Sequence, residues 1–389
     1  MATMRDRGLV KITVTLAVGF CLSLAKMSFA ADDPIRIGWI GALSGVLASY
    51  GLDNKRGVEF AVEQVNAKGG VKGRKLELIY VDSKFDPAFS VQAVQRLAMQ
   101  DRVVAILGDI SSALTLAQVP VTAKLGVPQL ASLAGTPRIT EMGSQFIFRP
   151  YPSVTLTYST LAVYATQKMN LNRFATLAYN DEGGLASIDA FKQAITKGGK
   201  GQIVASEVVP VDTKEFKPIL SKIRESNPDG LVLAAAASVS GLISKQAREL
   251  GWNVQLLGHG GYQAVPEYRD IAGPAGDGMV LATTYAPGLY QHTEAKKFVT
   301  EWSASHGGQL PRDMEAHGYD QINMLVWALS NGPPERKAIR DNLAKLNKWP
   351  GVAGIYTFLS NGDVDKDLII QAWKGGKLVP LEVYGRASR

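Results

Sequence analysis

From residue 35 to residue 258, short apolar runs alternate with amphipathic stretches that are long enough to form helices. In the first half of this pattern we predict strands at 35–40, 75–81, 103–107 and 128–130, and helices near 55–67, 87–100 and 114–124. Repeated strand, helix, strand units favour a parallel sheet with helices on both faces. The predicted fold class is therefore α/β.

The alternation is interrupted once, at the proline-rich segment 148–152 (FRPYP), and then starts again. The second series has predicted strands at 174–179, 203–209, 230–235 and 255–258, with helices near 155–168, 186–197, 215–225 and 239–250. A single hydrophobic core seldom grows beyond roughly 250 to 300 residues, and this chain has 389 residues. Two sheets separated by a junction predict two lobes.

Three helical patterns follow, at 292–306, 313–329 and 334–346. Beyond them, apolar runs at 354–358 and 368–373 flank the turn residues 361–363 (NGD). An Asn-Gly pair between two such runs is typical of a tight β-hairpin. We therefore predict that these two runs pair with each other.

The first 30 residues have the layout of a secretory signal peptide. Arg5, Arg7 and Lys11 precede an apolar run at 12–25, and small residues lead up to Ala30. This order of regions is typical of an export signal that is removed from the mature protein. The apolar run is shorter than the roughly 18 to 20 residues that a membrane-spanning helix needs. We therefore expect export to the periplasm and cleavage after Ala30.

Cys21 is the only cysteine of the chain, and it lies within this leader. Cleavage after Ala30 would leave a mature protein without cysteine, which excludes disulfides, cysteine nucleophiles and thiolate metal sites. The bulky Phe20 stands directly before Cys21 and departs from the small residues of a lipoprotein signal, so we do not expect a lipid anchor.

Charged residues give the chain a formal net charge of +7, but they are scattered rather than gathered in a basic run. The sequence also lacks the interleaved aromatic and basic residues of a nucleic-acid surface, so no nucleic-acid partner is expected. A modest positive charge is compatible with capture of anions and equally with ordinary solubility.

Motifs of catalysis and of cofactor binding are absent from the sequence. The glycines of residues 38–45 lack the spacing of a dinucleotide-binding loop, and neither a phosphate-binding loop nor a nucleophile elbow occurs. The four histidines show no metal-ligand spacing. We therefore expect a protein that is not an enzyme and that has no metal or organic cofactor, with an enzyme on a similar scaffold as an open alternative.

Two loops that follow neighbouring predicted strands carry groups that bind anions. Ser111 and Ser112 come directly before the helix near 114–124, and residues 133–136 follow the next strand. Hydroxyls and free N–H groups at a helix N-terminus can hold a carboxylate at the carboxyl edge of a parallel sheet. Each loop alone is more often plain helix capping. Their pairing favours a carboxylate site.

Several short segments form an ordered set along the chain. They are residues 37–45 (IGWIGALSG) with Tyr50 and Gly51, residues 66–77 (NAKGGVKGRKLE), Asp82 with Asp86 and Pro87, and Gly108 with Ser111 and Ser112. Together they resemble the periplasmic leucine/isoleucine/valine-type binding proteins of branched-chain amino acid ABC importers. The resemblance extends over nearly the whole chain, from residue 35 to about residue 373.

The resemblance implies a two-lobed, type I periplasmic-binding-protein fold with the ligand in the cleft between the lobes. Each lobe would be a mostly parallel sheet flanked by helices. Three crossovers, near Pro150, near Thr284 and within 363–368, would act as hinges that close on the ligand. The N-terminal lobe would comprise residues 31–150 and 285–365, and the C-terminal lobe would comprise residues 151–284 and 366–389.

The resemblance also assigns the carboxylate side of the ligand site. Ser111, with Ser112 beside it, and the backbone at Leu133 would hold the carboxylate. A threonine is usual at the position of Gly135, and here Thr136 follows one place later. The carboxylate site is therefore expected to be retained in an altered form.

The ammonium side departs further from the family pattern. The family's tyrosine and acidic residue align with Gly183 and Gly260, which cannot pair an amine through a side chain. Asp181 or Glu182 could substitute for them. Because a buried ammonium without a partner costs several kcal/mol, the sequence favours an aromatic or other amine-free carboxylate, with an amino acid or its amide as the second candidate.

The two glycines would leave room for a larger or flatter ligand beside Tyr50, Tyr262 or Tyr285. Tyr50 would cover the ligand side chain, although a core or rim position is equally compatible with its sequence context. The expected partners are a small carboxylate and the permease and ATPase subunits of an importer, with the binding protein as a monomer. A ligand-sensing protein coupled to a receptor is the alternative within the same fold.

Overall fold

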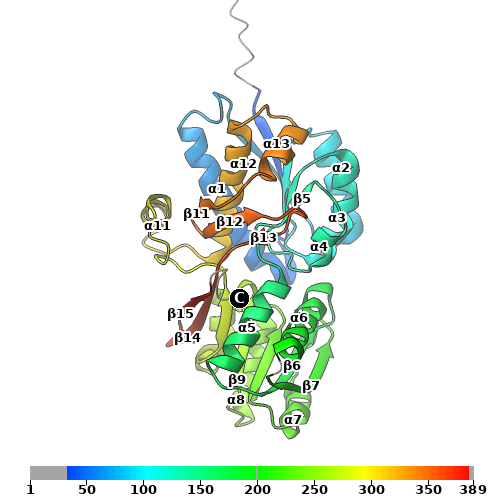
Figure 1. Cartoon of the computed structure of the whole chain (residues 1–389), viewed down its shortest axis with the longest axis vertical. Helices are drawn as coiled ribbons and strands as arrows, with labels where there is room; N and C mark the ends of the chain where they lie inside the picture. Colours follow the sequence, from blue (N-terminus) through cyan, green and yellow to red (C-terminus); the bar gives the residue numbers. More distant parts are fainter. Residues whose placement is uncertain (1–32, 199, 385–389) are drawn as a thin grey trace, which may run out of the picture.

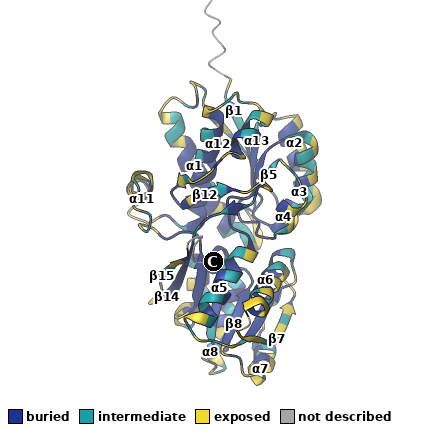
Figure 2. Ribbon diagram, in the orientation of Figure 1, coloured by how far each residue is buried: buried dark blue, intermediate teal, exposed yellow. Residues whose placement is uncertain are grey.

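The computed structural model describes residues 33–198 and 200–384, which form two lobes arranged one above the other (Figure 1). The predicted signal peptide lies outside the described residues. Each lobe is built around a central sheet whose residues are largely buried between helices (Figure 2). The two-lobed α/β fold expected from the sequence is confirmed.

The first lobe contains a parallel five-stranded sheet in the order β2-β1-β3-β4-β5. Its strands are β1 (Ile35–Gly41), β2 (Leu76–Asp82), β3 (Ala105–Leu107), β4 (Gln129–Leu130) and β5 (Ile147–Phe148). Its helices are η1 (Gly45–Leu47), α1 (Ala48–Ala67), α2 (Pro87–Met99), α3 (Ser112–Leu125), α4 (Arg138–Glu141), α11 (Thr293–Ser305), α12 (Asp313–Ser330) and α13 (Arg336–Leu343). A small sheet of β11 (Trp349–Gly351), β12 (Gly354–Phe358) and β13 (Val364–Asp365) completes this lobe.

Helices cover both faces of the five-stranded sheet, which explains why residues 37–41 of β1 are apolar on both faces. Ile37 and Trp39 of β1 belong to a core that includes α1 and α12, whereas Ile40 belongs to a separate core with Leu97 of α2. Successive side chains of a strand point to opposite faces, so a strand covered on both sides is apolar at every position. A Cβ on Gly38 would lie 3.0 Å from Leu97, which shows how closely α2 approaches β1.

The second lobe contains a seven-stranded sheet in the order β15-β14-β10-β9-β8-β6-β7. Strands β6 (Arg173–Tyr179), β7 (Gln202–Val209), β8 (Gly230–Ala234), β9 (Gln255–His259) and β10 (Val280–Thr283) are parallel, and β14 (Leu368–Lys374) and β15 (Lys377–Tyr384) are antiparallel to their neighbours. Its helices are α5 (Val154–Gln167), α6 (Glu182–Gly198), α7 (Lys217–Glu225), α8 (Ala237–Glu249), α9 (Gly260–Gln263), α10 (Pro266–Ala272) and η2 (Gly273–Gly276).

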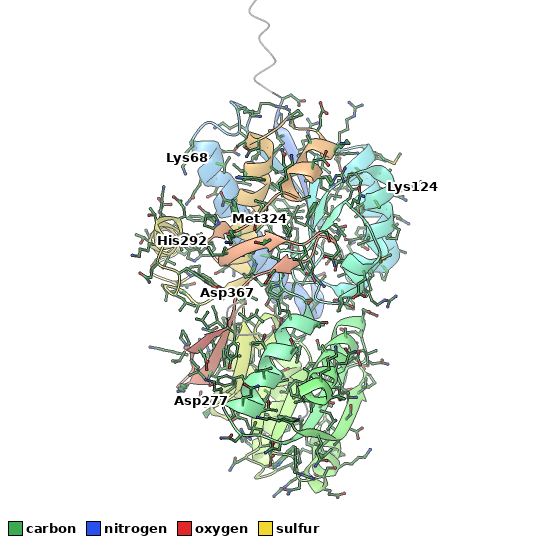
Figure 3. The ribbon with its side chains drawn as sticks, in the orientation of Figure 1. Lys68, Lys124, Asp277, His292, Met324 and Asp367 are labelled. Carbon is green, nitrogen blue, oxygen red and sulfur yellow. The ribbon has the colours of Figure 1, made fainter. Side chains whose placement is uncertain are left out.

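The chain passes between the two sheets at three places. It leaves the first sheet after β5 and enters α5, returns from β10 to α11, and crosses a last time between β13 and β14. Asp367, labelled in Figure 3, lies on this third crossover at the junction of the lobes. The three connections are short, as a hinge between rigid bodies requires.

The predicted pairing of residues 354–358 with residues 368–373 is wrong. β12 pairs with β13 across the turn that contains Asn361 and Gly362, while β14 pairs with β10 and β15 in the other lobe. The turn forms as predicted, but its returning strand has only two residues because the chain then departs for the second lobe. Strand β15, which we did not predict from the sequence, is the hairpin partner of β14.

Candidate functional site

A cavity of about 310 Å³ lies between the two lobes. The first lobe contributes Gly45, Leu47, Phe85, Ile110, Ser111, Ser112, Ala113 and Leu133, and the second contributes Tyr179, Asp181, Glu182, Gly183, Val211, Ala234, Ala235, Ala236 and Tyr262. Most of these side chains are apolar, and a cavity of this size accommodates a small organic molecule. The predicted residues Ser111, Ser112, Leu133, Asp181, Glu182 and Tyr262 are brought together here.

The N-terminus of α3 forms a polar end of the cavity. Ser111 is the N-cap residue of this 14-residue helix, but its hydroxyl makes no capping bond. Ser112 Oγ accepts hydrogen bonds from the N–H groups of Gly135 (3.2 Å) and Thr136 (3.3 Å), and it still has its own proton to donate. Unused donors at a helix N-terminus favour an anion at this point.

The loop after β4 supports this end of the cavity from behind. Leu133 borders the cavity, whereas Gly135 and Thr136 act on it through Ser112. A Cβ on Gly135 would lie 2.6 Å from Val154 Cγ1, so the threonine that the resemblance leads one to expect has no room here. Thr136 Oγ1 donates to Glu182 Oε1 at 3.1 Å and thereby connects the two lobes.

The N-terminus of α6 borders the same cavity but already holds a carboxylate. Asp181 Oδ1 accepts the N–H of Gly184 at 2.6 Å, as the side chain of an N-cap residue does. Burial raises the pKa of Asp181, and the neighbouring Glu182 carboxylate raises it further. Glu182 is paired with Arg138 Nη1 at 3.1 Å. The second lobe therefore presents negative charge where the first presents donors.

Two tyrosines shape the second-lobe side of the cavity. Tyr262 Oη would lie 2.7 Å from a Cβ on Gly183, so this hydroxyl fills the space that the glycine frees. Tyr179, which we did not select from the sequence, also lines the cavity, and its buried hydroxyl has no partner within residues 33–198 and 200–384. Burial raises the pKa of Tyr179 to about 12, so the hydroxyl keeps its proton at neutral pH.

Tyr50 does not line the cavity, in contrast to its expected place over the ligand side chain. It is fully buried, and its Oη donates to the carbonyl of Tyr262 at 2.9 Å and accepts the N–H of Ala237 at 2.8 Å. Tyr50 belongs to α1 of the first lobe, whereas both partners belong to the second. These two hydrogen bonds therefore join the lobes.

Tyr285 and Gly260 also lie away from the cavity. Tyr285 borders a second cavity of about 550 Å³ that β14 and β15 help to form. Gly260 packs against Thr283 of β10, where a Cβ would come within 2.7 Å of the Thr283 Cα. The room that we expected from the two glycines is therefore not present, because one faces a strand and the other faces the Tyr262 hydroxyl.

Several of the cavity residues that sequence reasoning missed share one signal. Phe85, Tyr179, Val211 and Ala235 each end a strand or follow it within three residues, in loops at the carboxyl edges of the two sheets. Ligands of open α/β sheets bind outside these carboxyl ends. The loop after every predicted parallel strand was therefore a candidate for lining the ligand site, and not only the two loops that we selected from the sequence.

Metal and membrane features are not found in the described chain. Within residues 33–198 and 200–384, no group of three or more His, Cys, Asp or Glu side chains could hold a metal ion. No helix in this part of the protein is long and apolar enough to cross a membrane. Burial lowers the pKa of His259 to about 4, so this histidine, which stacks on Tyr158, is neutral at physiological pH.

Two lobes that enclose a small-molecule cavity and are joined by three short crossovers define a solute-binding protein. The family described as periplasmic binding protein matches residues 34–377, and the chain belongs to this family. It is 27% identical over 345 residues to the Leu/Ile/Val-binding protein of Escherichia coli K12, covering 89% of this chain and 88% of that protein. The Leu/Ile/Val/Thr-binding protein of Salmonella typhimurium is 27% identical over 360 residues, 92% of each protein.

Solved structures show the same similarity. A leucine-binding protein from Thermotoga maritima has a TM-score of 0.86 at 25% identity and covers 91% of this chain and 100% of that one. A branched-chain amino acid transporter substrate-binding protein from Streptococcus pneumoniae, in complex with isoleucine, has a TM-score of 0.84 at 25% identity, covering 90% and 99%. A solute-binding protein from R. palustris in complex with benzoate shares the fold, with a TM-score of 0.82 at 22% identity, covering 90% and 96%. The chain is a solute-binding protein of the branched-chain amino acid type of ABC transporter, a class that binds its ligand without transforming it.

Proposed function

We propose that this chain is the exported component of an importer, which captures a small carboxylate between its lobes and delivers it to permease and ATPase subunits. The leader would be removed after Ala30, and the mature protein would act in the periplasm as a monomer. The lobes would comprise residues 31–150 with 285–365 and residues 151–284 with 366–389. The ABC transporter context of the family favours import over receptor-coupled sensing.

The observation that carries the proposal is the open N-terminus of α3. Ser111 occupies the N-cap position without capping, and Ser112 has a proton to donate. These donors border a cavity that is otherwise largely apolar. A ligand with one carboxylate and an apolar body matches this arrangement, because the helix N-terminus stabilises the anion and the walls bury the body.

The leading ligand class is an aromatic or other amine-free carboxylate. An α-ammonium needs an acidic partner when it is buried, and both acidic residues of the cavity already have partners within the chain. Glu182 binds Arg138 and Thr136, and Asp181 Oδ1 caps α6 through Gly184. Tyr179 and Tyr262 contribute flat aromatic surface to the cavity.

An amino acid is the second candidate, and one observation favours it. Asp181 lines the cavity, and only its Oδ1 is engaged in the capping bond, so Oδ2 could accept an ammonium. Proteins that share this fold are known in complex with isoleucine and with benzoate. The fold is therefore compatible with both ligand classes.

Titration calorimetry with leucine, valine, phenylalanine, benzoate and a hydroxycinnamate tests both the site and the ligand class. For the compound that binds, Ser111→Ala should weaken binding at least about tenfold, because a hydrogen bond to a charged group contributes about 1.5 to 3 kcal/mol. Ser305→Ala, which alters a hydroxyl of α11 outside the cavity, is the matched control. Wild-type affinity in Ser111→Ala moves the site elsewhere, and binding of leucine or valine without any amine-free acid refutes the leading class.

Export is tested separately by mass spectrometry of the protein isolated from the periplasm. We expect a mature chain that begins at Ala31. A periplasmic form that retains residues 1–30 would contradict the predicted cleavage.

A further inference from the structure

Arg149 is a fully buried residue that follows β5 directly, at the start of the first crossover. Its guanidinium forms a two-bond fork with Asp363, from Nε to Oδ1 at 3.0 Å and from Nη2 to Oδ2 at 2.6 Å. Asp363 stands directly before β13, next to the third crossover. Because a buried guanidinium without a counter-ion is strongly unfavourable, this pair holds the two crossovers together.

Backbone contacts reinforce the same junction. The N–H of Arg149 donates to the carbonyl of Gly362 at 2.8 Å. Gly362 has a φ of 83°, and a Cβ there would lie 2.1 Å from the carbonyl oxygen of Ile147. Only glycine permits both this conformation and this close approach. The turn before β13 therefore packs directly against the last residues of β5.

The Nη1 atom of Arg149 reaches the loop behind the ligand cavity. It donates to the carbonyl oxygens of Gly135 (3.1 Å) and Thr136 (2.5 Å). The Gly135 carbonyl also accepts the N–H of Val154, the first residue of α5 in the second lobe, at 2.8 Å. The carbonyl of Gly135 and the N–H of Thr136 belong to one planar peptide unit. Arg149 therefore holds this unit at its oxygen, while Ser112 Oγ holds it at its N–H.

The orientation of this peptide determines where the Ser112 proton points. Ser112 Oγ accepts the N–H groups of Gly135 and Thr136, so its two lone pairs are occupied. Its proton is then left for an acceptor in the cavity. If the peptide turned, Ser112 would lose these partners and its hydroxyl would be free to rotate away from a ligand.

We infer that Arg149 is a positioning residue for the ligand site, which it connects to the first and third crossovers. The inference rests on the proposed carboxylate site at Ser111 and Ser112. A ligand that orders the peptide between Gly135 and Thr136 also stabilises the arrangement of crossovers in which Arg149 is paired. Coupling between the site and the hinge then follows from one side chain that contacts both.

Hydrogen exchange in the ligand-free protein tests the inference without any ligand. Asp363→Asn removes the charge that orients the fork, and Arg149→Lys keeps the charge but loses the fork. In both variants, amide exchange in the segment 133–137 should accelerate at least about tenfold, the effect of losing one hydrogen bond to a charged group. Exchange in β1 and β3 should keep its wild-type rate.

Arg336→Lys is the matched control for this experiment. Arg336 also donates to backbone carbonyls of the first lobe, those of Ala98 and Val103, and does not line the cavity. It should leave exchange at 133–137 unchanged. Unchanged exchange there in a folded Asp363→Asn variant overturns the inference, and so does acceleration spread evenly over the first lobe. If one of the two test variants does not fold, the other decides; if neither folds, the role is structural and the inference fails.

Titration with benzoate and with leucine separates this inference from the proposed function. For the probe that binds, Asp363→Asn should raise the dissociation constant about tenfold while Arg336→Lys leaves it unchanged. If Ser111→Ala has no effect on affinity, the proposed carboxylate site fails. If Ser111→Ala weakens binding and Asp363→Asn does not, only the coupling through Arg149 fails.

Discussion

The N-termini of α3 and α6 border one cavity from opposite lobes, yet they differ in what occupies them. At α3, the N-cap residue Ser111 leaves its hydroxyl unused, whereas at α6 the carboxylate of Asp181 accepts the N–H of Gly184. The two ends are close, because Ser112 Oγ and Asp181 Oδ1 would lie 3.6 Å and 3.7 Å from a Cβ on Gly183. The carboxylate at α6 therefore sits at the N-cap itself, whereas the nearest carboxylate at α3, that of Asp109, lies before the helix and accepts the N–H groups of Ile110 and Ser111.

This difference predicts that the two helix N-termini interact with different parts of a ligand. Both helix N-termini carry a similar partial positive charge, so the preference for an anion depends on whether the chain already supplies one. Asp181 supplies it at the N-cap of α6, whereas Asp109 accepts only N–H groups that precede α3 and leaves the Ser111 hydroxyl for the ligand carboxylate that we propose. The Asp181 charge also disfavours a second anionic group near α6, so the ligand should bind with its apolar body toward the second lobe.

The largest effect is expected when the N-cap of α3 is given a carboxylate like that of α6. Ser111→Asp places a carboxylate at the N-cap of α3, where aspartate stabilises a helix and the fold should persist. Two like charges about 4 Å apart at an effective dielectric constant of about 20 repel by about 4 kcal/mol. We therefore expect calorimetry to show a loss of affinity of more than about a hundredfold for any carboxylate. The neutral isostere Ser111→Asn should lose about tenfold at most, and equal losses in both variants would contradict a charge effect.

The second variant removes the negative charge of Asp181 from the N-cap of α6. Asp181→Asn keeps an oxygen that can accept the Gly184 N–H but loses the charge. At a separation of about 7 Å the repulsion that disappears is about 2 kcal/mol before screening by salt. Affinity for benzoate should therefore rise about tenfold, while affinity for leucine should fall if its ammonium pairs with Asp181. A benzoate affinity that does not change would show that the two helix ends act independently.

The pH dependence of the wild-type protein gives a second measure of the same repulsion. Burial raises the pKa of Asp181, so its carboxylate becomes protonated at a higher pH than an exposed aspartate, whose pKa is about 3.9. As pH falls through this raised pKa, the negative charge at α6 disappears and binding of a ligand that stays ionised strengthens. Calorimetry of benzoate at stepwise lower pH, kept above the pKa of benzoic acid so that the ligand stays ionised, should show rising affinity in the wild type and none of this rise in Asp181→Asn.

Tyr50→Phe separates the interlobe contacts from the ligand contacts. The change removes the two hydrogen bonds of Tyr50 with Tyr262 and Ala237 but keeps the ring. Since both bonds cross between the lobes, their loss of about 1 kcal/mol or more penalises the closed state and not the open one. Affinity should fall about fivefold through a faster dissociation rate, and small-angle scattering should show a larger ligand-free particle. Tyr158→Phe, which loses a bond to Leu233 within one lobe, should change neither quantity.

Much of the fold follows from the sequence because its signals are local. Ten strands and most of the main helices were predicted within a few residues, since buried parallel strands are continuous apolar runs. The partner of residues 368–374 was not predictable in this way. The Asn-Gly turn indicates a local hairpin, whereas the actual pairing with β10 joins residues 280–283 to residues 369–372, and the chain between these strands runs through the first lobe.

The sequence predicted the cavity residues that directly follow a strand. It did not predict the residues whose place depends on how distant segments pack together. Ser111, Ser112 and Leu133 follow strand ends, and the structure brings them to the cavity. Tyr50 was misplaced because no local pattern shows that its hydroxyl meets Ala237 of the other lobe. Gly260 looked like freed space, but its neighbour Thr283 comes from a strand that the sequence does not place beside it.

The smallest expected effect concerns the ion pair between Arg138 and Glu182, of which Glu182 lines the cavity. Arg138 is 67% exposed and Glu182 is 26% exposed, and such pairs contribute about 0.2 to 1 kcal/mol, less in high salt. Arg138→Ala leaves Glu182 without its cationic partner beside Asp181, so the negative charge of the second lobe is no longer balanced. Benzoate affinity should therefore fall no more than about fivefold, and 1 M salt should abolish the difference from the wild type. Arg138→Ala combined with Glu182→Gln should restore the wild-type affinity, because the unbalanced charge is then gone; a loss that persists in the double variant would mean that Arg138 contributes by shape rather than by charge.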